Sequence, residues 1–175
     1  ETDLKMRKTI NCFIPYEENT AIDKVVTALK DSIVVNKIYL LTTAHGSMPS
    51  VPAGCEPFTI DSLNSSDTIK KIAQKADTPF TLLYTKASPF ELGYMALERI
   101  ADFLQDRKTG MVYADHYEWK EGEKKKHPAI DYQPGSVRDD FDFGALLAFR
   151  SEYLIGAAGM MENCLLYTSD AADEL

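Results

Sequence analysis

The sequence predicts a single α/β domain in which a mostly parallel β-sheet is covered by helices on both faces. Two observations carry this prediction. Short apolar runs typical of buried strands alternate with longer segments in which apolar residues recur at helical spacing. With 175 residues, of which 45% are hydrophobic, the chain is long enough for one compact core and too short for two full domains.

The first half of the chain has the pattern strand, helix, strand, strand, helix, strand. Each strand is a short apolar or β-branched run, and each helix has one apolar stripe behind a polar residue suited to capping its first turn. The expected strands are Thr9–Pro15, Ile38–Leu41 running into Thr42 and Thr43, Phe58–Ile60 and Phe80–Tyr84; the helices carry Ile22, Val25, Val26 and Leu29 behind a cap at Asn19 or Thr20, and Ile69, Ile72, Ala73 and Ala76 behind a cap at Ser65 or Ser66.

The second half adds a helix over about Glu91–Gln105, with Gly110 after it as a plausible terminator, and then a strand over Met111–Ala114. Lys120–Glu123 has the composition of a turn. The run Gly144–Phe149 is apolar again, and Ser151 is placed to cap a last helix.

Parallel strands joined by crossovers place their carboxyl ends along one edge of the sheet, and ligands of such sheets bind beyond that edge. Polar residues follow four of the predicted strands, and we therefore expect function there. They are Pro15-Tyr16-Glu17, Thr42-Thr43, Thr85-Lys86 and Asp115-His116.

The formal net charge of -8 argues against a nucleic-acid-binding protein, which normally shows a basic face. The sequence has no apolar stretch of the roughly 18 residues that a membrane span requires, and its first residues lack the apolar core of a signal peptide. The three cysteines have no metal-binding or disulfide spacing. These features predict a cytoplasmic protein and leave open its attachment to the inner face of the membrane.

Residues 164–175 resemble the translation of an adapter used to prepare sequencing libraries. We therefore expect a partial domain over residues 1–163, followed by an adapter-derived tail over residues 164–175.

The run Phe13-Ile14-Pro15-Tyr16-Glu17-Glu18, followed by an amphipathic helix, resembles the start of family 2 glycosyltransferases. Ala148–Leu154 matches a strand and helix that follow the donor site in that family, and Met111–Leu147 looks like a bacterial subgroup of it. The resemblance implies a Rossmann-like GT-A sandwich. It also implies transfer of a sugar, with inversion, from a nucleotide-diphosphate donor to a glycan or lipid-linked acceptor.

The resemblance implies that Pro15, Tyr16 and Glu17 touch the nucleotide. Thr42 and Thr43 stand where the family usually has paired acids that contact the base, and Thr85-Lys86-Ala87 stands where it has Asp-x-Asp. A magnesium or manganese ion held by such carboxylates would offset the charge of the departing diphosphate. Because those acids are absent here, metal dependence is open. Lys86 is either a direct partner of the diphosphate or a solvated loop lysine.

Asp115 is the candidate for a donor or metal ligand, and its alternative role is to cap a turn. Asp140-Phe141-Asp142 spells Asp-x-Asp, but it precedes its strand instead of following one. Trp119 is a sugar-stacking platform or a core residue. Lys124-Lys125-Lys126, after Glu121 and Glu123, indicates a solvated hairpin tip, with attraction to a membrane surface as the less favoured alternative.

No residue before Asn163 is a defensible catalytic base, which in the family lies farther along the chain. The catalytic residues are therefore unknown, and we expect this chain to be inactive as a transferase. Two other functions stay open. One is a sugar-nucleotide nucleotidyltransferase, although the expected glycine-rich loop is missing after the first strand. The other is a non-catalytic α/β module that binds a nucleotide or a sugar.

Overall fold

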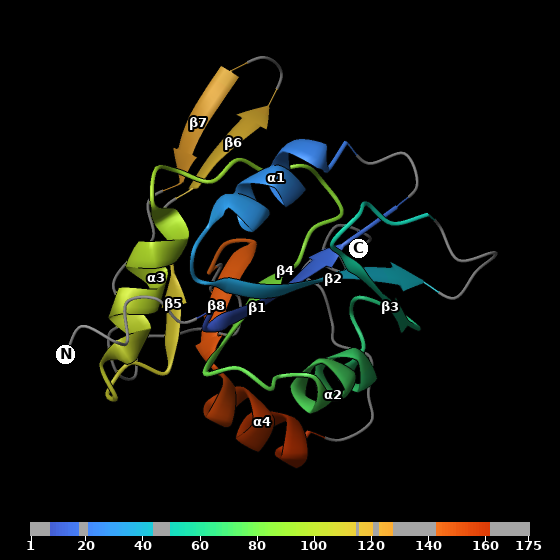
Figure 1. Ribbon diagram of the computed structural model, residues 1–175, viewed down its shortest axis with the longest axis vertical. Coiled ribbons are helices and arrows are strands. Elements are labelled where there is room, and N and C mark those ends of the chain that lie inside the picture. Colours follow the sequence, from blue (N-terminus) through green and yellow to red (C-terminus); the bar gives the residue numbers. More distant parts are fainter. Residues whose placement is uncertain are drawn as a thin grey trace, which may run out of the picture.

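The computed structural model of the chain describes residues 8–17, 21–43, 50–114, 116–120, 123–127 and 143–161. These residues form a six-stranded sheet of order β3-β2-β1-β4-β8-β5, a separate two-stranded ladder and four helices (Figure 1). The strands are β1 Ile10–Pro15, β2 Val35–Thr43, β3 Glu56–Ile60, β4 Phe80–Tyr84, β5 Met111–Tyr113, β6 His116–Lys120, β7 Glu123–His127 and β8 Leu146–Arg150. The helices are α1 Asp23–Asp31, α2 Ser66–Gln74, α3 Ala96–Gln105 and α4 Ser151–Met160.

The prediction of a mostly parallel sheet is confirmed. Strand β1 pairs in parallel with β2 and with β4, and β2 pairs in parallel with β3. Strand β8 lies between β4 and β5 and is antiparallel to both, so β5 runs in the same direction as β4. All the strands of this sheet except β8 therefore end at the same edge.

The core has two layers because successive side chains of a strand point to opposite faces of the sheet. In β1, Ile10, Cys12 and Ile14 pack with the apolar residues of α1 and α3. Phe13 points to the other face, where it stacks on Tyr39 with ring centroids 4.8 Å apart and belongs to the cluster that includes residues of α2 and α4. Figure 1 shows α1 above the sheet and α2 and α4 below it, so the prediction of helices on both faces is also confirmed.

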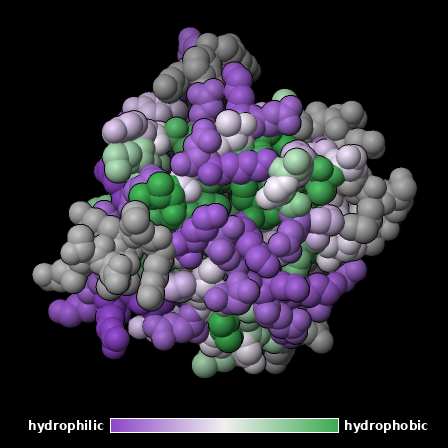
Figure 2. Space-filling view, viewed as in Figure 1, coloured by the Kyte–Doolittle hydropathy of each residue, from purple (hydrophilic) through white to green (hydrophobic). Residues whose placement is uncertain are grey.

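Hydrophilic side chains cover most of the face shown in Figure 2, and hydrophobic atoms are visible between them. Among the described helices, none combines the length and the apolar character needed to cross a bilayer.

Three predicted helix starts are wrong. α3 begins at Ala96, not near Glu91, because Met95 before it adopts a left-handed conformation with φ of 49°. Ser151 does not cap α4; the cap position is Arg150, and the buried Ser151 hydroxyl lies 2.8 Å from the Thr81 hydroxyl of β4. A tertiary hydrogen bond has taken the oxygen that local capping would use. The cap position of α1 is Ile22, not the predicted Asn19 or Thr20, which themselves lie outside the described residues.

Candidate functional site

The order of the sheet reverses beside β1, since β2 lies on one side of it and β4 on the other. In open α/β sheets such a reversal opens a crevice beyond the carboxyl ends of the two strands at which it occurs, here β1 and β4. Ligands of these sheets bind in that crevice. Tyr16 directly follows β1, and Lys86 is the second residue after β4; both are among the residues that the sequence selected. The reversal therefore marks this part of the edge as the candidate site.

Tyr16 is fixed by hydrogen bonds at both of its ends. Its backbone N–H donates to the carbonyl of Leu41 at 2.8 Å and extends the pairing of β1 with β2. Its hydroxyl donates to the carbonyl of Ser50 at 3.2 Å, and its ring packs on the core. Pro15 is buried at the end of β1, and Glu17 is exposed. Among the described residues of this segment, Glu17 is thus a charged group that solvent reaches.

The two threonines at the end of β2 have different environments. Thr42 is 4% exposed, whereas Thr43 is exposed beside Ile60 of β3. Of the pair, Thr43 is the one positioned to meet a ligand in solution, and contact between a ligand and Thr42 would require the surrounding residues to move.

The segment after β4 is shaped by contacts that the sequence did not reveal. Thr85 continues the pairing with β8, since its backbone N–H and its hydroxyl both donate to the carbonyl of Ala145, at 2.9 and 3.2 Å. The Tyr84 hydroxyl lies 3.1 Å from that of Ser88, and its ring lies 4.2 Å from the ring of Phe90. The exposed Lys86 therefore lies between Thr85, which is bonded to Ala145, and the residues Ser88 and Phe90, which contact Tyr84.

Shortly after the end of β5, His116 lies close to Gly144. Asp115 itself lies outside the described residues, so its role as a donor or metal ligand stays a prediction. Gly144 has φ of 81°, and a Cβ at this position would lie 3.1 Å from Nδ1 of His116. Glycine suits this position because its φ lies in the left-handed region, and a Cβ would also press on the His116 ring. Tyr113 and Phe143 pack edge to face nearby, with centroids 5.1 Å apart.

The structure brings only some of the predicted residues close together. Tyr16 and Lys86 follow adjacent strands, whereas Thr43 and the end of β5 are separated by four strand spacings, or roughly 19 Å at about 4.8 Å each. The twist of the sheet adds to this separation, and Figure 1 shows β5 running across the direction of β2. A ligand that reached both ends would have to be elongated.

A metal centre finds no support among the described residues, which include no group of three or more His, Cys, Asp or Glu side chains placed to hold an ion. Asp140 and Asp142, like Asp115, lie outside that part of the chain. Two cysteines are within it, and burial raises the pKa of both Cys12 and Cys55. Neither thiol is therefore suited to act as a nucleophile.

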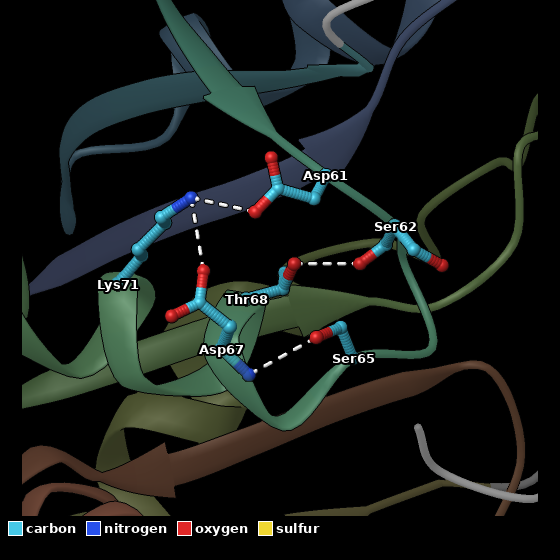
Figure 3. Close-up of polar contacts among 6 residues, drawn as sticks. All are labelled: Asp61, Ser62, Ser65, Asp67, Thr68 and Lys71. Atoms are coloured by element: carbon cyan, nitrogen blue, oxygen red, sulfur yellow. Dashed lines mark hydrogen bonds and ion pairs between the residues drawn. The ribbon is translucent and has the colours of Figure 1, made fainter. Parts of the chain in front are cut away.

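A second polar cluster lies beyond β3, at the start of α2 (Figure 3). The Ser65 hydroxyl accepts from the backbone N–H of Asp67 at 3.2 Å, which confirms Ser65 as the cap of α2. Lys71 bridges the carboxylates of Asp61 and Asp67 at 3.1 and 2.9 Å, and its hydrogen bond holds the pKa of Asp67 below the ordinary value. Thr68 donates to the carbonyl of Ser62 at 2.6 Å. The groups satisfy one another, so this cluster serves the helix start.

Comparison with known proteins gives one distant structural likeness. No protein-family model matches the chain, and no curated protein matches it. A solved structure of CMP:2-keto-3-deoxy-manno-octonic acid synthetase complexed with CTP aligns with a TM-score of 0.47 and 9% identity, over 89% of this chain and 78% of that one. A likeness of this size assigns no function to the chain.

Proposed function

We propose that this chain binds a nucleotide-diphosphate sugar at the β1–β4 reversal of its sheet, as the donor-binding part of an inverting glycosyltransferase. The observation that supports this most is the placement of Tyr16 and Lys86 on adjacent strands at that reversal. The family resemblance of the sequence near Pro15 suggests the chemical class, and the reversal of strand order marks the part of the edge where ligands of such sheets bind.

The charge of the diphosphate is the main requirement that the site must meet. Lys86 is an exposed cation at the end of β4, where the resembling family has carboxylates and a metal. A lysine that contacts a phosphate forms a charge-assisted hydrogen bond without any ion between them. The first turn of α1 begins shortly after Glu17 and, as at any helix start, has backbone N–H groups suited to a phosphate.

In this proposal the sugar is passed to a glycan or a lipid-linked acceptor. A divalent cation, magnesium or manganese, would add Lewis-acid stabilisation of the leaving diphosphate if Asp115 holds it. Among the described residues we assign no catalytic base, so the proposal for this chain is donor binding and not turnover.

Calorimetric titration with uridine and guanosine diphosphate sugars, with and without manganese, tests the proposal. We expect binding of one donor class, weakened about tenfold or more by Lys86→Ala, because a hydrogen bond to a charged group contributes about 1.5–3 kcal/mol. Lys108→Ala is the matched control, since Lys108 is also exposed and follows α3, outside the candidate site. Manganese will strengthen binding if carboxylates outside the described residues join the site.

Three results would contradict the proposal. Equal affinities of the Lys86→Ala and Lys108→Ala variants would remove Lys86 from the site. Failure to bind any nucleotide would favour a non-catalytic module for another ligand. Release of pyrophosphate from a nucleoside triphosphate in the presence of a sugar substrate would identify a nucleotidyltransferase instead.

A further inference from the structure

Residues 50–55, which lead into β3, form a short segment that we call the strap. Its half-buried residues Val51 and Cys55 pack on the core cluster that also contains the apolar residues of α1. Its first residue, Ser50, accepts a hydrogen bond from the Tyr16 hydroxyl at 3.2 Å. Because Tyr16 directly follows β1, this end of the strap borders the candidate site at the carboxyl edge of the sheet.

The other end of the strap is closed by a tight turn, which is bonded to the last turn of α1. The backbone N–H of Cys55 donates to the carbonyl of Pro52 at 3.1 Å, and Gly54 in this turn has φ of 82°. Glycine suits that position because it adopts a positive φ without strain. The ammonium group of Lys30 donates to the carbonyl of Ala53. Since α1 leads from the carboxyl end of β1 to the amino end of β2, its last turn lies away from the candidate site.

The two hydrogen bonds that hold the strap differ in strength. The bond from Tyr16 joins two neutral groups and is long for a hydroxyl donor. The bond from Lys30 has a charged donor, and such bonds are stronger than neutral ones. The stem of Lys30 also lies against the turn, where a Cβ added at Gly54 would be 3.0 Å from Cε of the lysine. The end of the strap at the candidate site is therefore the end that is held less firmly.

Three parts of Tyr16 have partners within the protein. Its backbone N–H donates to the carbonyl of Leu41, its ring packs on the core cluster, and its hydroxyl donates to Ser50. These contacts attach both β2 and the strap to the turn that leads to the exposed Glu17. Such an arrangement suits a residue that holds neighbouring groups in place better than one that contacts a ligand itself.

We propose that Tyr16 is a positioning residue whose hydroxyl keeps the strap attached beside the turn after β1, so that this side of the site has its shape before a ligand binds. Without the hydroxyl, the strap should detach at Ser50 and stay attached at Ala53. A donor would then have to order the strap on binding, and ordering of that kind lowers affinity. The consequence for donor affinity rests on the proposed function; the attachment of the strap does not.

Hydrogen–deuterium exchange and calorimetric titration of Tyr16→Phe test the proposal, because this substitution removes the hydroxyl and keeps the ring. In the ligand-free variant we expect the strap amides to exchange at least several-fold faster, while the amides of β4 keep their protection and report that the fold is intact. The affinity for the uridine or guanosine diphosphate sugar should fall about threefold to tenfold, the range expected for loss of one neutral hydrogen bond. Saturation with that sugar should slow the exchange of the strap again, which a strap unconnected with the site would not show.

Lys30→Met is the matched control, since it removes the hydrogen bond at the other end of the same strap and keeps most of the side-chain stem. It should speed the exchange of the turn around Gly54. Because the charge that it removes is exposed and lies away from the site, donor affinity should change by less than about twofold.

Three results would overturn the proposal. Unchanged strap exchange in Tyr16→Phe would show that the hydroxyl does not hold the strap. Faster strap exchange with unchanged donor affinity would show that the strap does not shape the site, and so would equal losses of affinity in Tyr16→Phe and Lys30→Met. If the unaltered protein binds no nucleotide, the proposed function fails instead, and the exchange of the ligand-free strap still decides whether Tyr16 holds it.

Discussion

At its amino edge the six-stranded sheet is held by the hydrogen bonds of a buried side chain, whereas at its carboxyl edge several polar groups are exposed. Asn11 near the start of β1 is fully buried, and its amide donates to Asp77 at 2.6 Å and to the Lys75 carbonyl at 3.3 Å while accepting from Asn36 at 2.9 Å. At the other edge, Glu17, Thr43 and Lys86 are exposed.

This difference separates polar residues that hold the fold from polar residues available to a ligand. A buried amide that makes three hydrogen bonds is costly to alter, because its replacement loses all three of them at once. Replacing an exposed side chain at a strand end costs less, because water reaches the position before and after the substitution. The two edges should therefore respond to mutation in opposite ways, with stability lost at one and ligand affinity lost at the other.

The largest expected effect is that of Asn11→Leu at the amino edge. The leucine has a similar volume but makes none of the hydrogen bonds to Asp77, Lys75 and Asn36. At about 1 kcal/mol for each of these bonds, we expect a loss of about 3 kcal/mol in the free energy of unfolding. Urea denaturation followed by circular dichroism measures it. A loss below about 1 kcal/mol would show that the network contributes little and would erase the contrast between the edges.

Thr9→Val is a useful control beside it. The Thr9 hydroxyl is the buried side-chain polar atom that has no hydrogen-bond partner among the described residues. Its removal should leave stability unchanged or raise it, because a buried polar atom without a partner costs free energy.

Arg150→Met is expected to have the next largest effect, about 2 kcal/mol. The Arg150 guanidinium, at the amino edge, donates to the carbonyls of Leu104, Asp106 and Thr109 and thereby ties the end of α3 to β8. Arg99→Met removes an exposed arginine from α3 itself and should cost far less. Thermal unfolding of the two variants side by side measures the difference, and equal melting temperatures would rule out this role for Arg150.

Ser65→Ala tests the polar cluster of Figure 3, which lies beyond β3 but serves the fold. Loss of the cap should cost about 1 kcal/mol in the free energy of unfolding, and Ser65→Asp, which can still accept from the helix N–H groups, should restore most of it. Nucleotide affinity should be the same in both variants. A change in that affinity would mean that the cluster belongs to a binding site.

The smallest effects on stability are expected at the exposed positions of the carboxyl edge. Lys86→Ala and Thr43→Ala should each change the free energy of unfolding by less than about 0.5 kcal/mol, since neither side chain is buried. Denaturation curves recorded without ligand measure this. A larger loss at Lys86 would show that the lysine stabilises the loop after β4. The donor affinity measured for Lys86→Ala would then have to be corrected for the fraction of folded protein.

The elements that could be predicted from the sequence are those with a strong local signal. Phe80–Tyr84 is a buried apolar run, and it forms β4 with those same bounds. A cap at Ser65 or Ser66 could be predicted because a hydroxyl precedes an amphipathic stripe, and the structure assigns it to Ser65. The start of α3 could not be predicted, because the left-handed conformation of Met95 has no sequence signal of its own.

The candidate site was predicted in part for the same reason. A polar residue after an apolar run shows where a strand ends, which identified Tyr16, Thr43 and Lys86. It does not show which ends are neighbours, and the pairing order of the sheet separates Thr43 from the end of β5. The network of Asn11 was missed altogether, since its partners Asp77 and Asn36 are far from it along the chain.

The sequence by itself determined the class of fold, most of the strands and the residues at their ends, because hydrophobic periodicity and capping act over a few neighbouring residues. Tertiary structure alone decided the order of the strands and the insertion of antiparallel β8 between β4 and β5. It also decided that the Ser151 hydroxyl forms a hydrogen bond with the Thr81 hydroxyl instead of capping a helix. These outcomes depend on contacts between residues far apart in the chain. Their free energy comes from packing and buried hydrogen bonds that no local pattern specifies.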